Sequence, residues 1–251
     1  MPFTSNISCV WQPPLPQKVM ETQQPQLVII PTPIGNLADL TPRAQQWLAT
    51  LEVLACEDTR RTKQLLQHFG ITGKKRFLAH HQGNEVPSAQ GLVKLMQAGQ
   101  SVGYLTDGGM PSISDPGYVL VREVLAAGFT VSPLAGPSAV TTALAGAGIP
   151  ASRFTFLGFL PRGKGPQTKL LQRFVDTPEA LVIYESPQRV AKTLAMLAEV
   201  LGARPACLCR EMTKAHETFV RDDLSALAAW AAGQDSVKGE CTLIIGPNAT
   251  D

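Results

Sequence analysis

The chain has 251 residues, and its 22 basic and 20 acidic residues leave a net charge of +2 at pH 7. A charge this close to neutral does not by itself indicate a nucleic-acid partner, although it is compatible with a local basic patch. Hydrophobic residues make up 44% of the chain, which is ordinary for a globular protein, and no apolar run approaches the roughly 18 residues of a membrane span.

Residues 1–25 are rich in Pro, Gln, Ser and Thr, lack the apolar core of a signal peptide, and predict a disordered segment in a cytoplasmic protein. In chain order we then predict strand 27–30, helix 42–49, strand 51–55, a helix ending at 69, helix 90–98, strand 101–105, helix 118–127, strand 130–133 and a helix opened by residues 135–138. Strand, glycine-bearing loop and helix in this rhythm indicate a parallel sheet covered by helices, with ligand sites at the carboxyl ends of its strands.

Residues 146–153 interrupt the rhythm and predict a boundary between two α/β domains, 26–148 and 149–251. Beyond it we predict strand 154–157, a loop over 160–167, helix 168–175, strand 180–184, helix 187–201, strand 206–210, helix 222–232 and strand 240–245. The late apolar strand indicates that this second sheet is mixed rather than purely parallel.

The five cysteines fit no disulfide framework, because their number is odd and their spacing irregular. Cys207 and Cys209 are separated by one residue instead of the two of a metal-binding knuckle, so no metal site is predicted. We expect buried thiols in a reducing compartment.

Two polar loops follow predicted strands. In residues 107–111, Asp-Gly-Gly-Met-Pro, the glycines allow a ligand to approach the backbone closely, and a plain tight turn is the alternative. The loop is neither a dinucleotide-binding fingerprint nor a Walker loop, which argues against NAD and ATP. Residues 57–61 carry two carboxylates and two guanidinium groups, which either cap the next helix beside a solvated basic face or line a cleft.

Two further polar segments are less specific. Residues 160–169 form a Gly- and Pro-rich basic loop, which is either solvated or in contact with a phosphate backbone. His80 and His81 would point to opposite faces of a strand, so they do not form a metal pair and are expected to be surface residues.

Several stretches together resemble one family: Pro31-Thr-Pro-Ile-Gly-Asn-Leu37, Glu57-Asp-Thr-Arg60, Ser114-Asp-Pro-Gly117, Gly136-Pro-Ser138, Gly158-Phe-Leu-Pro161, Tyr184-Glu-Ser-Pro187, Arg210-Glu211 with Thr213-Lys214, and Lys238-Gly-Glu240. In this order, over residues 27–246, they are similar to the 16S rRNA (cytidine-2′-O)-methyltransferases of the tetrapyrrole-methylase superfamily. The resemblance implies two α/β domains with S-adenosylmethionine in the cleft between them, a homodimer, and 16S rRNA of the small ribosomal subunit as the substrate.

The resemblance also implies the residues of the site. Those expected to bind the cofactor are Pro33, Gly35, Asp107, Gly109, Met110, Ser112, Ile113, Ser138, Ala139 and Tyr184. The family usually has Asp-Ala-Gly-Thr-Pro at residues 107–111, so Met110 replaces a hydroxyl and is expected to pack against the cofactor instead. Family members commonly carry a further small helical segment beyond the strand that follows Lys238, which we expect to concern RNA docking more than methyl transfer.

A ribose hydroxyl is a weak nucleophile and benefits from a base or from a cation that stabilises the developing alkoxide. The ionisable residues in the matching motifs, and so the catalytic candidates, are Asp58, Glu57, Lys214 and Glu240. The candidates for contacts to RNA phosphates are Arg60, Arg61, Arg162, Lys164 and Arg189. Two alternatives remain, a methyltransferase of a tetrapyrrole such as a uroporphyrinogen or corrin precursor, and a non-catalytic RNA- or ribosome-binding protein on the same fold.

Overall fold

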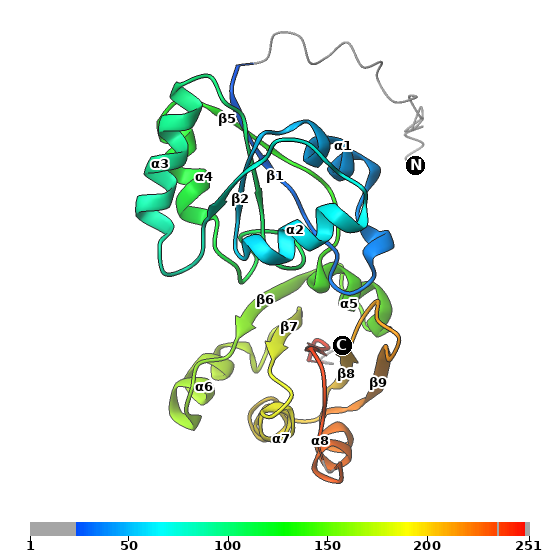
Figure 1. Cartoon of the computed structure of the whole chain (residues 1–251). Coiled ribbons are helices and arrows are strands. Elements are labelled where there is room, and N and C mark those ends of the chain that lie inside the picture. The colour runs from blue at the N-terminus through cyan, green and yellow to red at the C-terminus, as the bar shows by residue number, and fades with distance from the viewer. Residues whose placement is uncertain (1–23, 235, 249–251) are drawn as a thin grey trace, which may run out of the picture.

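The computed structural model describes residues 24–234 and 236–248, which form two five-stranded sheets, one in each half of the chain (Figure 1). Both sheets carry helices on their faces, as an α/β fold requires. The predicted disorder of residues 1–25 falls, except for Gln24 and Pro25, outside the described residues. Within the described ranges, no helix has the length and apolar character needed to cross a membrane.

The first sheet has the strand order β3-β2-β4-β1-β5, and every neighbouring pair is parallel. Its strands are β1 Gln26–Ile29, β2 Val53–Cys56, β3 Arg76–Ala79, β4 Val102–Leu105 and β5 Thr130–Pro133. The three central strands are buried throughout, which explains their mostly apolar sequences. The parallel sheet predicted for this half is confirmed, and the carboxyl ends of β1, β2 and β4 lie at one edge of it.

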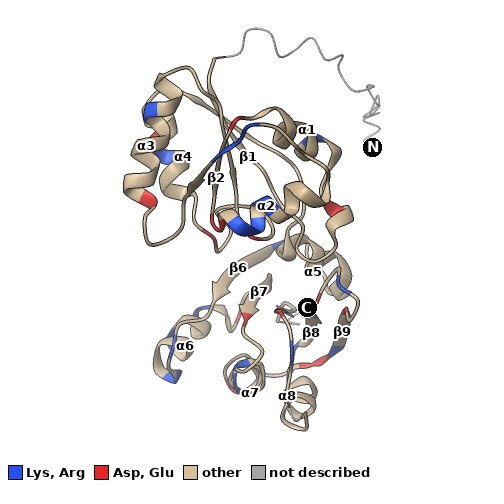
Figure 2. Ribbon diagram, in the orientation of Figure 1, with Lys and Arg blue, Asp and Glu red and all other residues tan. Residues whose placement is uncertain are grey.

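Two pairs of helices cover this sheet. One face carries α1 Pro42–Thr50, preceded by the 3-10 turn η2 Leu37–Asp39, and α2 Thr59–His68, while the other face carries α3 Glu85–Gln97 and α4 Tyr118–Ala126. Thr41 begins α1 as predicted, since its hydroxyl accepts a hydrogen bond from the amide of Ala44 at 3.1 Å. Figure 2 shows the basic residues of α2 at the edge of this domain nearest the second sheet.

The second sheet has the order β6-β7-β10-β8-β9. Its strands are β6 Phe154–Phe159, β7 Ala180–Glu185, β8 Pro205–Arg210, β9 Thr218–Asp223 and β10 Cys241–Ile245. Only β6 and β7 are parallel, and the other three pairs are antiparallel, so the prediction of a mixed sheet is confirmed.

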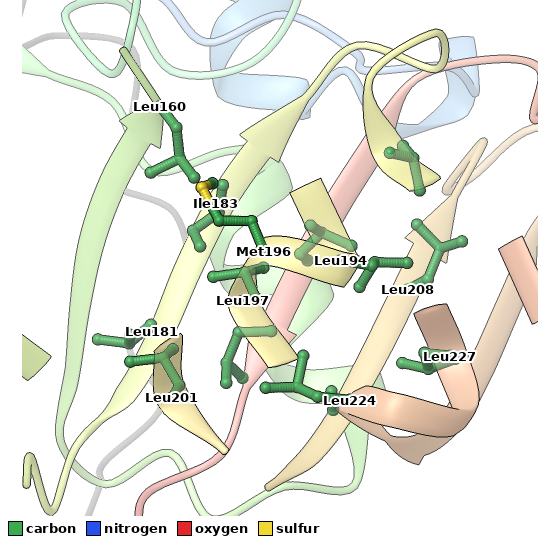
Figure 3. Close-up of a cluster of buried hydrophobic side chains, with 14 of the residues drawn as sticks. Leu160, Leu181, Ile183, Leu194, Met196, Leu197, Leu201, Leu208, Leu224 and Leu227 are labelled. Carbon is green, nitrogen blue, oxygen red and sulfur yellow. The ribbon is translucent and has the colours of Figure 1, made fainter. Parts of the chain in front are cut away.

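One face of the second sheet packs on α6 Lys164–Leu171, the turn η3 Gln172–Phe174, α7 Val190–Leu201 and α8 Leu224–Ala232 around a leucine-rich core (Figure 3). The other face packs on α5 Ala139–Ala147 through Val140, Ala143 and Ala147. The proposed domain division at residue 148 therefore leaves α5 in the first domain by sequence, although its apolar side packs against the second sheet.

Two helices begin earlier than predicted. Each has a proline in its first turn, and a proline there does not interrupt the helix. The helix α3 begins at Glu85 instead of residue 90, and α6 begins at Lys164 instead of residue 168. Pro87 and Pro166 are each the third residue of their helix, where a missing N–H costs no intrahelical hydrogen bond. The segment predicted as a loop over 160–167 is therefore helical from residue 164 onward.

The strand β9 was not predicted. It pairs with β8 over residues 218–223 at the edge of the sheet, and α8 begins at Leu224, two residues later than expected. Its Thr-Phe-Val-Arg-Asp-Asp sequence ends in exposed charges, which are common on edge strands and obscure the apolar pattern.

The expectation that His80 is a surface residue was wrong. Its side chain is fully buried against the ring of Tyr104, with the ring centroids 4.9 Å apart, and burial lowers the pKa of the imidazole. The four cysteines among the described residues, Cys56, Cys207, Cys209 and Cys241, are free and buried, as expected for structural thiols.

Candidate active site

A cavity of about 1070 Å³ lies between the two sheets and is lined by both halves of the chain. From the first half it is lined by the loops that follow β1, β2 and β4, which include Pro33, Glu57 and Asp107. From the second half it is lined by the end of β7 at Tyr184, by Glu211, Met212 and Lys214, and by residues 239–242. The three loops of the first half thus share one rim at the carboxyl ends of their strands.

A backbone bridge joins two of these loops. The amide of Thr32 donates to the carbonyl of Gly109 at 3.0 Å, and the amide of Gly109 donates to the carbonyl of Thr32 at 2.9 Å. Gly109 has φ of +85°, and a Cβ at Gly108 would lie 3.4 Å from the carbonyl oxygen of Pro33. The pair of glycines therefore leaves bare backbone at the cavity wall, where a ligand can approach closely.

The loop after β1 also contacts the second half of the chain. A Cβ at Gly35 would lie 2.5 Å from Cγ of Lys214 and 2.7 Å from Oγ1 of Thr213, so only glycine fits there. The amide of Asn36 donates to Oγ1 of Thr213 at 3.0 Å. These contacts fix the two sides of the cavity relative to each other.

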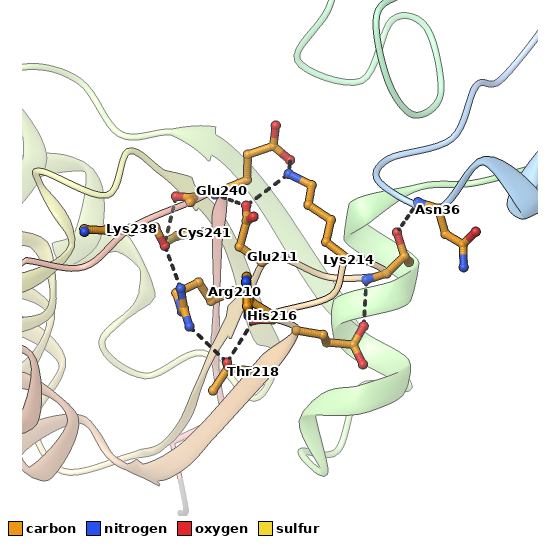
Figure 4. A network of polar contacts seen from close by, with 12 residues as sticks. Asn36, Arg210, Glu211, Lys214, His216, Thr218, Lys238, Glu240 and Cys241 are labelled. Carbon is orange, nitrogen blue, oxygen red and sulfur yellow. Dashed lines mark hydrogen bonds and ion pairs between the residues drawn. The ribbon is translucent and has the colours of Figure 1, made fainter. Parts of the chain in front are cut away.

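A charged network occupies the second-half side of the cavity (Figure 4). The Nζ of Lys214 lies 3.0 Å from Glu211 Oε1 and 2.9 Å from Glu240 Oε2, and the amide of Glu240 donates to Glu211 Oε1 at 2.8 Å. Burial opposes the charge of Lys214, but the two carboxylates outweigh it and raise the pKa of the ammonium group. Lys214 is therefore a cation in this arrangement, suited to stabilise negative charge and unsuited to act as a base.

Three carboxylates gather on the first-half side. Glu57 Oε2 accepts a hydrogen bond from the amide of Asp107 at 3.3 Å, and Asp107 also lies 3.4 Å from the guanidinium of Arg61. Asp115, in the Ser114–Gly117 motif, lines the same cavity and was not predicted as a site residue. Burial and then the nearby charge of Glu57 raise its pKa from 3.8 to about 6.

Asp58 has a different environment from its neighbour Glu57. It is the N-cap of α2, accepts the amide of Arg60 at 2.8 Å, and pairs with the Arg60 guanidinium at 2.8 Å. The hydrogen bonds from Arg60 lower the pKa of Asp58 to about 2. Neither Asp58 nor Arg60 is among the residues that line the cavity, so the helix-capping interpretation describes this pair.

Tyr184 lies at the cavity while the next residue turns into the core. The pKa of Tyr184 is raised to about 12 by burial and by the charge of Asp115, which faces it from the first half. The buried Glu185 accepts hydrogen bonds from Ser186 N at 2.7 Å and Thr193 Oγ1 at 2.6 Å, and it pairs with Arg189 at 3.2 Å. Arg189, a candidate for RNA contacts, is thus held by a buried carboxylate.

The remaining predicted residues fall into those that line the cavity and those that do not. The cofactor candidates that line the cavity are Pro33, Gly35, Asp107, Gly109, Met110, Ile113, Ser138, Ala139 and Tyr184. Ser112 does not line the cavity, and its amide donates a hydrogen bond to the carbonyl of Pro116 at 3.2 Å. Lys164 pairs with Glu199 at 2.9 Å, away from the cavity. Arg162 and Arg189 line a second, smaller cavity.

The comparisons with known proteins bear on this cavity. Residues 26–228 match the family of Tetrapyrrole (Corrin/Porphyrin) Methylases. The chain is 41% identical over 239 residues to ribosomal RNA small subunit methyltransferase I of Mesorhizobium japonicum, covering 95% of this chain and 80% of that protein. It is 43% identical over 227 residues to the protein of the same name from Escherichia coli O157:H7, covering 90% and 79%. The chain belongs to the ribosomal RNA small subunit methyltransferase I family of the tetrapyrrole methylases.

Solved structures of tetrapyrrole methylases share the fold. Uroporphyrin-III C-methyl transferase from Thermus thermophilus, in complex with S-adenosylhomocysteine, superposes with a TM-score of 0.60 at 21% identity. The superposition covers 88% of this chain and 97% of that one. Both halves of the present chain therefore share the fold of that enzyme.

Proposed function

We propose that the chain transfers a methyl group from S-adenosylmethionine to the 2′-hydroxyl of a cytidine ribose in 16S rRNA of the small ribosomal subunit. The observation that carries the proposal is a single cavity with a glycine wall and three carboxylates on its first-half side and a lysine held by two carboxylates on its second-half side. Its volume of about 1070 Å³ is at the upper end of ligand-sized sites, which leaves room for a cofactor and an acceptor nucleotide.

The glycine wall suits the cofactor. The bare backbone of Gly108 and Gly109 gives a nucleoside a close approach, and Met110 and Ile113 add apolar contact. The other residues that would hold the cofactor are Pro33, Gly35, Asp107, Ser138, Ala139 and Tyr184. When bound, S-adenosylmethionine supplies a methyl group on a positively charged sulfur, and the protein mainly aligns donor and acceptor.

The carboxylates of the first-half side and the lysine of the second-half side together suit the acceptor hydroxyl. Asp115, with a pKa of about 6, is ionised at neutral pH yet more basic than an ordinary carboxylate, so it is the best-placed group to accept the hydroxyl proton. Glu57 lies beside it and helps to keep that pKa high. Lys214 provides a positive charge for the developing alkoxide, while Glu211 and Glu240 hold it in place.

The test is transfer of labelled methyl groups from S-adenosylmethionine to small ribosomal subunits that lack the modification, followed by mapping of the labelled nucleotide. We expect label on one cytidine ribose. In a parallel reaction with a uroporphyrinogen as the acceptor, label on the uroporphyrinogen and none on the subunits would identify a tetrapyrrole methyltransferase. Binding of subunits and cofactor without transfer would identify a non-catalytic protein, and either result overturns the proposal.

We also infer that the protein acts as a homodimer in the cytoplasm, where its ribosomal substrate is assembled. The family membership supports both points. Sedimentation equilibrium of the purified chain at micromolar concentration tests the dimer, and a monomer at that concentration would contradict it.

A further inference from the structure

A second cavity of about 750 Å³ lies next to the active-site cavity, and Phe159 and Ser186 line both of them. Its other lining residues are Leu160, Pro161, Arg162, Gly163, Gln167 and Arg189. A ligand that enters the active-site cavity past Phe159 therefore has a neighbouring space of ligand size on the outer side of the same wall.

The wall between the two cavities is an exposed aromatic ring. Phe159 ends β6 next to Tyr184 of β7, and their ring centroids are 5.7 Å apart in an edge-to-face arrangement. Although Phe159 contacts Tyr184, 57% of it remains exposed. The following residue, Leu160, is buried in the leucine-rich core, so the backbone that presents the ring is anchored (Figure 3).

The five basic residues predicted to contact RNA differ in whether they are already paired. Arg60, Arg61 and Lys164 each lie within 3.4 Å of a carboxylate oxygen, and Arg189 is paired with the buried Glu185. Arg162 is exposed and makes no ion pair or hydrogen bond with any residue in 24–234 or 236–248. Of the five arginine and lysine residues predicted to contact RNA, Arg162 alone thus has its full charge free for an external anion.

The frame of the second cavity is fixed before any ligand arrives. Arg189 donates to the carbonyl of Leu160 at 3.1 Å, and the side-chain amide of Gln167 donates to the carbonyl of Pro161 at 2.7 Å. These bonds hold the 160–163 segment between two helices. Arg189 and Gln167 therefore position the segment, while Phe159 and Arg162 remain free to bind.

From this arrangement we infer that the second cavity binds the RNA nucleotide next to the acceptor, with its base stacked on Phe159 and its phosphate on Arg162. The inference rests on the proposed function, because it places the acceptor ribose in the first cavity. Unpaired bases in RNA are commonly recognised by stacking on aromatic side chains, and one free cation beside the ring supplies the phosphate contact. A flat ring with an adjacent guanidinium matches a nucleotide better than it matches an apolar ligand.

Phe159→Leu tests the stacking contact, since it keeps the apolar bulk and removes the flat face. We expect the KM for small ribosomal subunits to rise about 5- to 150-fold, with the Kd for S-adenosylmethionine unchanged. Phe159→Tyr, which keeps an aromatic face, should restore the KM. Equal loss in the Leu and Tyr variants, or a parallel loss of cofactor affinity, would refute the stacking role.

Arg162→Gln tests the phosphate contact, with Lys192→Gln as the matched control. Lys192 is exposed on α7, lines neither cavity, and its substitution removes the same charge. We expect Arg162→Gln to lower the slope of log affinity against log salt by about 0.7–1 for a labelled single-stranded RNA oligonucleotide, and Lys192→Gln to leave it unchanged. The same change in both variants would show a general effect of charge and overturn the inference. A wild-type protein that binds this RNA but transfers no methyl group would defeat the proposed function and leave this binding test intact.

Discussion

Replacing Asp115 with Asn should make the protein more stable at neutral pH while it impairs the reaction. The folded state raises the pKa of Asp115 from 3.8 to about 6, because the carboxylate is half-buried and lies near Glu57. A shift of about 2 units corresponds to about 3 kcal/mol against the ionised form. Because the cavity is open to solvent, we take about 1–2 kcal/mol as the part that appears in stability.

The sign of the pH dependence follows from proton binding. Between pH 4 and pH 6 the folded state holds the proton of Asp115 more tightly than the unfolded state does, so the free energy of unfolding falls as the pH rises through this window. Below pH 4 Asp115 costs nothing, and above pH 6 the full cost is present. Asn carries no charge at either pH, so the advantage of Asp115→Asn should grow from near zero at pH 4 to its full value at pH 7.5.

Thermal unfolding at several pH values provides the assay. For a chain of this size, about 1–2 kcal/mol corresponds to a rise in Tm of about 2–8 °C at pH 7.5. Asp39→Asn is the control, since it makes the same chemical change in η2 at a residue that lines neither cavity. The reasoning would be refuted if Asp115→Asn had a lower Tm than the parent at pH 7.5. It would also be refuted if the substitution changed Tm by the same amount at pH 4 and at pH 7.5. Turnover should fall by about 10²–10⁴-fold if Asp115 accepts the hydroxyl proton.

Three further substitutions test the site. Gly109→Val should abolish calorimetric binding of S-adenosylmethionine, whereas Gly70→Val, also at positive φ but with open space around it, should only lower stability. Asp58→Asn should keep the cap of α2 and change turnover less than tenfold, and a fall of about 10²–10⁴ in the methyl-transfer assay would return Asp58 to the mechanism. Gly239→Ala should lower the free energy of unfolding in urea by about 2–4 kcal/mol, because its Cβ would displace Glu211 from its hydrogen bonds, and a neutral result would contradict that close contact.

The first sheet could be predicted because its local signals and its tertiary structure agree. Buried parallel strands have continuous apolar sequences, and each is followed by a loop and an amphipathic helix. The starts of α3 and α6 could not be predicted in the same way. Proline is a breaker within a helix but is tolerated in the first turn, and the sequence alone does not say which position it occupies.

The site illustrates the same limit at the level of single side chains. The sequence places Glu57 and Asp58 together after a strand, and only the backbone geometry separates a carboxylate that lines the cavity from one that caps a helix. Asp115 lies in a motif that the resemblance includes, but its raised pKa depends on Glu57, which is 58 residues away in the chain. Such properties arise from burial and from distant neighbours, so periodicity and spacing do not report them.

Backbone strain gives independent support for the cavity as the working part of the molecule. Among residues 24–234 and 236–248, the non-glycine residues with positive φ are Ser112, Ser114, Glu211 and Thr213. They lie on two loops, one from each half of the chain, and Ser114 and Glu211 line the cavity itself. Each such residue costs about 1–3 kcal/mol and persists only where its surroundings hold it. Here the holding contacts are visible, since Glu211 accepts the amide of Glu240 and Thr213 accepts the amide of Asn36. The Asn36–Thr213 bond joins the two halves of the chain, and the Glu240–Glu211 bond joins two loops of the second half. The contacts that hold these strained residues therefore also shape the cavity on which the proposed chemistry depends.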